Sequence, residues 1–159
     1  MSECIHRDLC PNDCPCDYYE KEKRMKIKLD PGAFVPEYAH EDDAGMDLKS
    51  PVNGWLHPGQ HLKIDTGVHM AIPRGYFGLI TSKSGLMLQG ITSRGCVDSG
   101  YTGSISAVLF NHGENGLEIR RGDKITQIVI LKAEKPTIEL VDDLEETERG
   151  ESGFGSTGR

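Results

Sequence analysis

The sequence predicts a single all-β domain, a β-sandwich or jelly roll with very little helix. Three observations favour this class. The chain of 159 residues is long enough to bury a core without disulfides or metals. From Met25 onward, short runs of Val, Ile and Leu are cut by Gly, Pro and Asp, which is typical of many short strands joined by turns. No fixed-period repeat is present.

The strands follow in order from residues 25–29, where apolar and polar residues alternate with a period of two. Further strands are predicted at residues 60–65, 67–72, 78–81, 107–110, 124–132 and 137–141. Turn chemistry separates them at residues 31–32, 53–54, 58–59, 73–75 and 111–116. One helical turn is predicted over residues 84–89, with Ser84 as its N-cap.

Charge and hydropathy exclude two classes of partner. The chain has 18 basic and 25 acidic residues and a net charge of -7, so it lacks the broad basic surface that binds nucleic acid. No apolar run approaches the roughly 18 residues of a membrane span, and the N-terminus does not resemble a signal peptide. We therefore expect a cytoplasmic protein that binds neither nucleic acid nor a membrane.

Residues 1–24 form a polar N-terminal extension that we expect to be loosely ordered. Its cysteines are Cys4, Cys10, Cys14 and Cys16. They could bind zinc or form a disulfide, but they lack paired C-x-x-C spacing, and disulfides are rare in the cytosol. A reduced tail is the favoured reading of the three.

The segment from Gly95 to Gly103 combines hairpin chemistry with two side chains that could act on a ligand. Its glycines permit tight turning, and residues 103–110 are expected to return into the sheet as a strand. This geometry would place Asp98 and Tyr101 beside one concavity. Read alone, the segment could also be an ordinary turn, with Asp98 as a turn former and Cys96 as a small apolar strand residue.

Four other segments are rich in glycine and functional side chains. Residues 44–48 carry one carboxylate, Asp47, and residues 82–85 offer hydroxyls, a cation and backbone N–H groups as a phosphate cradle. Residues 121–127 lead a turn into a strand, and a glycine-rich tail begins at residue 149. Each segment alone has the composition of an ordinary loop or flexible end.

In their order and spacing, the five segments resemble the motifs of the trimeric dUTPase family, the deoxyuridine triphosphate nucleotidohydrolases. The matching residues are 44–48, 82–85, 95–103, 121–128 and 149–158, and the resemblance spans residues 25–159. It implies a jelly-roll domain over residues 25–144 that forms a homotrimer with active sites at subunit interfaces. Residues 145–159 would be a lid that closes over the nucleotide.

The resemblance also implies the reaction, which is Mg²⁺-dependent hydrolysis of dUTP to dUMP and pyrophosphate by attack of water on the α-phosphorus. Asp98 would be the catalytic base, and Tyr101 would pack under the deoxyribose. Asp47 would hold Mg²⁺ through water. The nucleoside-binding residues implied are Gly95, Cys96, Val97, Asp98, Tyr101 and Phe154. The phosphate-binding residues implied are Lys83, Ser84, Gly85, Gln127, Arg149, Gly155, Ser156 and Thr157.

The chain departs from the family pattern at two positions. Lys83 stands where the family usually has Arg, and lysine cannot make the bidentate contact of a guanidinium. Gly100 stands where a second carboxylate often precedes the tyrosine. Neither departure removes the atoms expected to act on water.

Two other functions remain open at this point. The dCTP deaminases share the fold and the hairpin frame of residues 98–103, but they carry a catalytic Glu on the following strand, where this chain has Val108. A nucleotide-sensing regulatory protein that acts through the Cys-rich extension would also explain residues 1–24.

Overall fold

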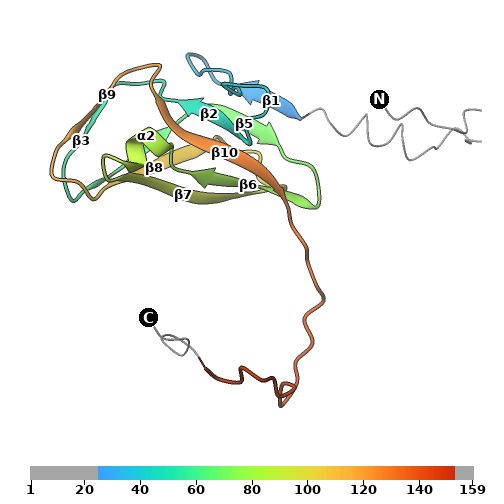
Figure 1. The fold of residues 1–159 in the computed structure, drawn as a ribbon. Coiled ribbons are helices and arrows are strands. Elements are labelled where there is room, and N and C mark those ends of the chain that lie inside the picture. The colour runs from blue at the N-terminus through green and yellow to red at the C-terminus, as the bar shows by residue number, and fades with distance from the viewer. Residues whose placement is uncertain (1–24, 153–159) are drawn as a thin grey trace, which may run out of the picture.

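The computed structural model describes residues 25–152 and confirms an almost entirely β protein with very little helix (Figure 1). Within that range there is one short helix, α2 (Ser84–Met87). The strands are β1 (Lys26–Leu29), β2 (Gly45–Lys49), β3 (Gly54–Leu56), β4 (His61–Asp65), β5 (Val68–Ala71), β6 (Tyr76–Thr81), β7 (Ile91–Asp98), β8 (Ser106–Asn111), β9 (Leu117–Ile119) and β10 (Lys124–Lys132). None of the described helices is long and apolar enough to cross a membrane.

The strands form one large curled sheet and two small ones, all with antiparallel pairing. The large sheet has six strands in the order β2-β10-β6-β7-β8-β4, while β1 pairs with β5 and β3 pairs with β9. Strand β10 lies between β2 and β6, so residues from the beginning, middle and end of the chain meet there. This arrangement brings residues 45–48 on β2 beside residues 124–128 on β10, while residues 82–85 directly follow β6, the other neighbour of β10.

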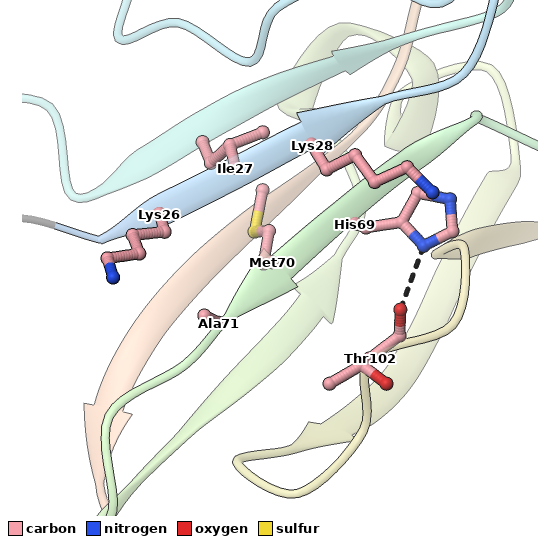
Figure 2. Close-up of a pocket in the computed structure, with 7 residues that line it drawn as sticks. All are labelled: Lys26, Ile27, Lys28, His69, Met70, Ala71 and Thr102. Atoms are coloured by element: carbon pink, nitrogen blue, oxygen red, sulfur yellow. Dashed lines mark hydrogen bonds between the residues drawn. The ribbon is translucent and has the colours of Figure 1, made fainter.

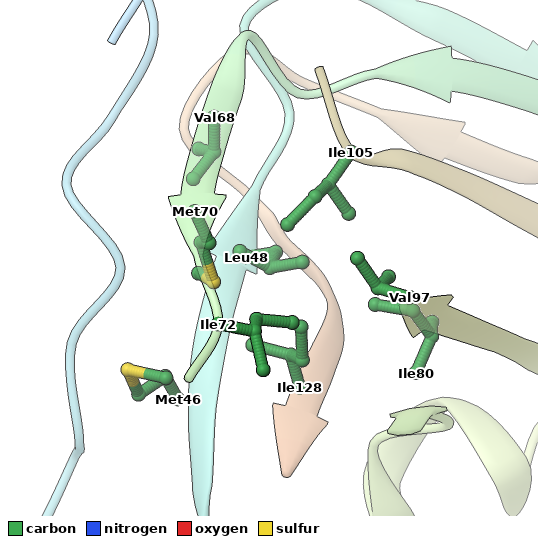
Figure 3. Close-up of a cluster of buried hydrophobic side chains, with 9 residues drawn as sticks. All are labelled: Met46, Leu48, Val68, Met70, Ile72, Ile80, Val97, Ile105 and Ile128. Carbon is green, nitrogen blue, oxygen red and sulfur yellow. The ribbon is translucent and has the colours of Figure 1, made fainter. Parts of the chain in front are cut away.

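The core consists of two apolar clusters. The first lies between the large sheet and the β1–β5 pair, and Figure 3 shows its side chains converging: Met46, Leu48, Val68, Met70, Ile72, Ile80, Val97, Ile105 and Ile128. The second contains Leu56, Ile64, Ile91, Ala107, Leu109, Ile119 and Ile125. Burial of each Leu or Ile side chain contributes about 2 kcal/mol to the free energy of folding, relative to leaving it exposed to water. These clusters therefore hold the sheets together beneath the functional segments.

One strand prediction is wrong. Residues 137–141 do not form a strand in this chain, although the segment carries the apolar residues that suggested one. The chain leaves the body after β10 and runs away from it as an extended arm (Figure 1). Ile138 is 92% exposed and Leu140 is 98% exposed. A strand needs a neighbouring strand to satisfy its backbone groups, and the described part of this chain supplies none here.

The helix cap prediction is also wrong. Lys83 occupies the N-cap position of α2 with an extended backbone (φ −77°, ψ 138°), and no side chain caps the helix. Ser84 is instead the first helical residue.

The expected turn forms at Ser99 and Gly100, where the Tyr101 N–H donates to the Asp98 carbonyl at 3.0 Å, but it does not need a left-handed glycine. No positive φ occurs at Gly95, Gly100 or Gly103, and Gly95 lies inside β7. For strand β7, the sequence predicted only the part around Cys96. The part before it was missed because Thr92, Ser93 and Arg94 break the apolar pattern.

Candidate functional site

Asp98 and Tyr101 line one concavity, as the sequence predicts. The pocket has a volume of about 310 Å³ and lies between the second half of β7, the following loop and β4. It is lined by Lys63, Ile80, Gly95, Cys96, Val97, Asp98, Tyr101, Ser104, Ile105 and Ser106. Asp98 is the one carboxylate among these residues, and it is exposed.

The pocket exposes a free backbone edge. Strand β7 pairs with β6 from Arg94 to Asp98. On its other side, β7 pairs with β8 only from Ile91 to Ser93. Between residues 94 and 98, the described strands therefore leave one edge of β7 without a ladder partner, and its amide and carbonyl groups can bind a flat polar ligand.

The loop that follows β7 holds the Tyr101 ring in a fixed place. The Tyr101 N–H donates to the carbonyl of Asp98 at 3.0 Å, and the Tyr101 hydroxyl donates to the carbonyl of Ser104 at 2.9 Å. A Cβ at Gly103 would lie 2.5 Å from the Tyr101 hydroxyl oxygen. Gly103 is therefore required because the aromatic ring packs directly against its backbone.

The end of this loop is bonded to the β4–β5 turn. Ser104 Oγ donates to the Asp65 carboxylate, and the Gly67 N–H donates to the same carboxylate at 3.0 Å. These hydrogen bonds, that of Ser104 first, lower the pKa of Asp65. The Ile105 N–H donates to the carbonyl of Val68 at 2.8 Å, which extends the attachment.

A second cluster forms around Asp47, which is buried with 2% exposure. Lys83 Nζ donates to Asp47 Oδ1. Lys124 Nζ lies 2.7 Å from Asp47 Oδ2 as an ion pair, in a geometry outside that of a hydrogen bond. Burial opposes ionisation of Asp47, but the contacts from Lys124 and Lys83 outweigh burial and lower its pKa. Asp47 is therefore an anion compensated by two cations.

Gln127 lies beside this ion-paired cluster on β10. It stands opposite Asp47 on one side and Thr81 on the other, and its Nε2 donates to the Ser82 carbonyl at 3.1 Å. A Cβ at Gly45 would lie 2.7 Å from Gln127 Oε1. The absence of a side chain at Gly45 leaves the space that Gln127 occupies.

The start of α2 completes this cluster. Ser82 Oγ donates to the Ser93 carbonyl and accepts from the Ser93 N–H, so the segment is bonded to β7. Ser84 and Gly85 follow Lys83 at the first helical positions, where backbone N–H groups have no intrahelical partner. Nothing lies within 4 Å of a Cβ built on Gly85, so its backbone is open to a ligand.

Asp47 fits a water-mediated Mg²⁺ contact in its charge but not in its accessibility. Magnesium keeps most of its waters and takes phosphate oxygens, so one carboxylate is a sufficient protein contribution. Among residues 25–152, no group of three or more His, Cys, Asp or Glu could hold a metal alone. Both Asp47 oxygens, however, face ammonium groups. A hydrated ion could reach this carboxylate only after Lys83 or Lys124 turns away.

The structure thus groups the predicted residues in two places. The first group lies beside the paired strands β2 and β10 and consists of Asp47, Lys83, Ser84, Gly85 and Gln127. Gly95, Cys96, Val97, Asp98 and Tyr101 line the pocket.

The remaining predicted residues belong to neither group. Arg149 lies in an exposed turn of the arm, and its Nε donates to the Ser152 carbonyl at 3.0 Å. Eight further predicted residues lie outside the described range: Cys4, Cys10, Cys14, Cys16, Phe154, Gly155, Ser156 and Thr157.

Some residues at these two places were not predicted from the sequence. Lys63, Ser104 and Ser106 line the pocket, and Lys124 pairs with Asp47. Lys63 enters because β4 pairs with β8, placing it opposite Val108. The Lys-Ile-Thr-Gln stretch at the start of β10 did contain a signal for Lys124, since it stands three residues before Gln127.

Comparison with known proteins agrees with this arrangement. Residues 33–158 match the dUTPase family model. The chain is 43% identical over 143 residues to the deoxyuridine 5'-triphosphate nucleotidohydrolase of Clostridium tetani, covering 87% of this chain and 99% of that relative. It is 39% identical over 140 residues to the enzyme of the same name from Gloeothece citriformis, covering 85% and 97% of the two chains.

Solved structures show the same relationship. The Staphylococcus bacteriophage 80alpha dUTPase with dUPNHPP superposes with a TM-score of 0.79 at 30% identity, covering 86% of this chain and 99% of that one. A variant dUTPase from phage phi11 of S. aureus, solved to show the coordination of a structural Mg(II) ion, gives a TM-score of 0.71 at 27% identity over 77% and 99% of the chains. The chain belongs to the dUTPase family.

Proposed function

We propose that this protein hydrolyses dUTP to dUMP and pyrophosphate. The observation that carries the proposal is the free edge of β7 beside Asp98 and Tyr101, inside a pocket of about 310 Å³. Backbone N–H and C=O groups of Gly95, Cys96 and Val97 are the proposed partners of the donors and acceptors along the uracil edge. They discriminate against the amino group of cytosine, because a donor facing a donor leaves both unpaired.

Asp98 is the proposed catalytic base. Asp98 is exposed at the end of β7, so its carboxylate is free to bind a water molecule that lies beside the α-phosphorus of a bound nucleotide. Asp98 takes a proton from that water as the oxygen–phosphorus bond forms and the bond to the bridging oxygen of pyrophosphate breaks. Positioning of water and nucleotide in line supplies most of the rate enhancement, without a covalent intermediate.

Tyr101 is the proposed selector for deoxyribose. Its ring is held against Gly103 and its hydroxyl is occupied by the Ser104 carbonyl. A rigid, apolar ring face under the sugar leaves no partner for a 2′-hydroxyl group. Buried unpaired hydroxyls are costly, so ribonucleotides are disfavoured.

The phosphates are the proposed ligands of the residues grouped around Asp47 and of the lid. Lys83, Ser84 and Gly85 offer an ammonium group, a hydroxyl and open backbone N–H groups, while Gln127 offers an amide. The lid, residues 145–159, would add further contacts, with Phe154 stacked on uracil. Its proposed phosphate ligands are Arg149, Gly155, Ser156 and Thr157.

Mg²⁺ is the proposed cofactor. When bound, it would neutralise the charge of the triphosphate, which this acidic chain needs. Asp47 would contact its hydration shell once Lys83 exchanges the carboxylate for a phosphate oxygen. The buried Asp47 would then keep Lys124 as its compensating cation.

A homotrimer with active sites at subunit interfaces is the proposed assembly. The extended arm after β10 exposes Ile138 and Leu140 almost completely. Large apolar side chains on an extended segment are stabilised when another surface covers them. An arm that leaves its own body can carry residues 145–159 to a neighbouring subunit. The proposal keeps the sequence-based expectation of a cytoplasmic location, and the prediction for residues 1–24 lies outside the described residues.

The alternatives predict other products. A dCTP deaminase would need a carboxylate near residue 108, but Val108 stands there, paired with Lys63. A regulatory role through Cys4, Cys10, Cys14 and Cys16 stays a prediction. The test is a pyrophosphate-release assay with Mg²⁺ across dUTP, dCTP, dTTP and UTP, with ammonia measured in parallel. Pyrophosphate from dUTP supports the proposal; ammonia from dCTP without pyrophosphate from dUTP overturns it.

A further inference from the structure

His69 on β5 connects the hairpin loop to the β1–β5 sheet. Its Nδ1 lies 2.8 Å from the carbonyl oxygen of Thr102, and its Nε2 lies 3.2 Å from Asp30 Oδ2. Figure 2 shows the ring reaching from β5 toward the loop, with the bond to Thr102 drawn. Thr102 directly follows Tyr101, so the contact is one residue away from the proposed selector for deoxyribose.

Both partners of His69 are acceptors. A backbone carbonyl and a carboxylate can only accept, whereas a neutral imidazole has one N–H and one acceptor nitrogen. Neutral His69 can therefore satisfy Thr102 or Asp30 but not both. The imidazolium ion satisfies both, and the hydrogen bond to Thr102, followed by that to Asp30, raises the pKa of His69.

The surroundings of His69 contain charges of both signs. Lys28 stands directly opposite it in the β1–β5 ladder, and Lys26 lines the same pocket. Asp30 faces Nε2, and Asp65 interacts with the ring through its charge. The lysines oppose protonation and the carboxylates favour it. A pocket of about 220 Å³ lies beside the ring, whose side chain is 18% exposed.

The rest of the loop is held by contacts that do not involve Thr102. Tyr101 bonds within the loop to Asp98 and Ser104, and Ser104 is bonded to Asp65 after the turn. At Thr102, the described contact with the body of the domain is the one from His69. Releasing it removes this attachment of Thr102 to the β1–β5 pair, and Tyr101 is then held by its bonds to Asp98 and Ser104 within the loop.

We propose that His69 is a positioning residue for the nucleotide: its two-sided bond to Thr102 and Asp30 holds Tyr101 in the orientation that receives deoxyribose and excludes ribose. This inference rests on the proposed hydrolysis of dUTP. His69 does not touch the reacting atoms, so its loss affects nucleotide affinity and sugar discrimination more than the chemical step.

The proposal predicts a pH effect of defined sign. The raised pKa means that the fully bonded state exists at pH values below the folded-state pKa and is lost as the pH rises through it. KM for dUTP therefore increases as His69 loses its proton, whereas kcat changes little. One hydrogen bond corresponds to roughly a fivefold change in affinity.

The experiment compares wild type with His69→Ala, His69→Gln and His57→Gln. Kinetics with dUTP and UTP are measured across the pH range, together with binding of a non-hydrolysable dUTP analogue and thermal unfolding. His69→Ala should raise KM roughly fivefold, lower the preference for dUTP over UTP, and lose the pH-dependent rise in KM. His69→Gln keeps a neutral donor for Thr102, so it should recover part of the affinity without the pH dependence.

His57→Gln is the matched control, because His57 is exposed and lies outside both pockets. It should keep the wild-type profile, including any titration of dUTP itself. If both His69 variants keep the wild-type KM, pH profile and sugar preference, the inference is overturned. If His69→Ala does not fold, His69→Gln decides by the same criteria. If wild type neither binds nor hydrolyses dUTP, the proposed function fails instead.

Discussion

Asp47 and Asp98 lie on strands β2 and β7, which are separated by β10 and β6 in the large sheet. Across the sheet, Asp47 pairs with Gln127, Gln127 pairs with Thr81, and Thr81 pairs with Arg94. Asp98 lies four residues beyond Arg94 on β7. With about 4.8 Å between strands and about 3.4 Å per residue, the Cα atoms of Asp47 and Asp98 lie roughly 20 Å apart along the surface of the sheet. We therefore expect the metal proposed beside Asp47 and the α-phosphorus proposed beside Asp98 of the same chain to belong to different active sites.

This separation predicts complementation between subunits. Asp98→Asn and Lys83→Ala should each be nearly inactive alone, because each removes one half of every site. When the two inactive variants are unfolded, mixed and refolded together, part of the activity should return, since mixed assemblies contain sites with both halves intact. Each variant refolded alone is the control, and no recovery in the mixture would place both halves in one chain.

The exposed arm predicts a dependence of assembly on Ile138 and Leu140. Ile138→Asp combined with Leu140→Asp should lower the oligomeric state measured by light scattering, because each apolar side chain is worth about 2 kcal/mol when buried. A double substitution at Glu139 and Asp142, to Gln and Asn, is the matched control and should leave assembly unchanged. An oligomer unaffected by the Asp substitutions would remove the arm from the interface.

Two glycine substitutions separate stability from substrate binding. Gly45→Ala would push its Cβ against Gln127 Oε1, a flexible side-chain end 2.7 Å away. Gly78→Ala would place its Cβ 2.6 Å from Ile128 Cδ1 and 3.1 Å from Ile72 Cδ1, inside the core. We expect Gly45→Ala to raise KM with little loss of stability.

The core substitution should behave in the opposite way. Gly78→Ala should cost about 1–3 kcal/mol through overpacking while KM stays near wild type. Thermal unfolding and steady-state kinetics of the two variants give both quantities. A Gly45→Ala variant that is destabilised with an unchanged KM would show that Gln127 is not a phosphate ligand.

The ion pairs of Asp47 predict a pH-dependent stability. Because the pKa of Asp47 is lowered from 3.8, its contribution is present above that value and is lost as the pH falls through the folded-state pKa. Asp47→Asn should destabilise the protein at neutral pH by about 1–3 kcal/mol, less than a fully buried pair because the lysines are partly exposed.

The difference between Asp47→Asn and wild type should shrink in acid, as measured by urea unfolding at several pH values. Glu37→Gln is the control, because Glu37 pairs with Lys49 at the surface and should contribute little. A destabilisation by Asp47→Asn that stays constant down to the lowest pH would contradict the assignment of Asp47 as an ion-paired carboxylate.

Local pattern was sufficient for much of the fold. The alternation at Lys26–Leu29 and the apolar run at Lys124–Lys132 each predicted a strand that the structure confirms. The short strands β3 and β9 were missed, because three residues carry too little periodicity. The segment at 137–141 has strand composition without a strand partner in the same chain, and composition alone cannot supply that partner.

The two groups of site residues could be proposed only in part. Asp98 and Tyr101 are close in sequence, so their shared pocket followed from the hairpin. The entry of Lys63 into that pocket depends on the pairing of β4 with β8, and the bond from His69 to Thr102 joins residues 33 positions apart. Such contacts arise from sheet order, which short-range patterns do not determine.

The most direct test of the central claim is the substitution Asp98→Asn, measured for turnover and for nucleotide binding on the same preparation. Asn keeps the size and polarity of the side chain but cannot take a proton from water. We predict that kcat with dUTP falls by a factor of about 100 to 10,000, while the affinity for a non-hydrolysable dUTP analogue stays within a few-fold of wild type. Turnover close to wild type with intact binding would contradict the role of Asp98 as the base.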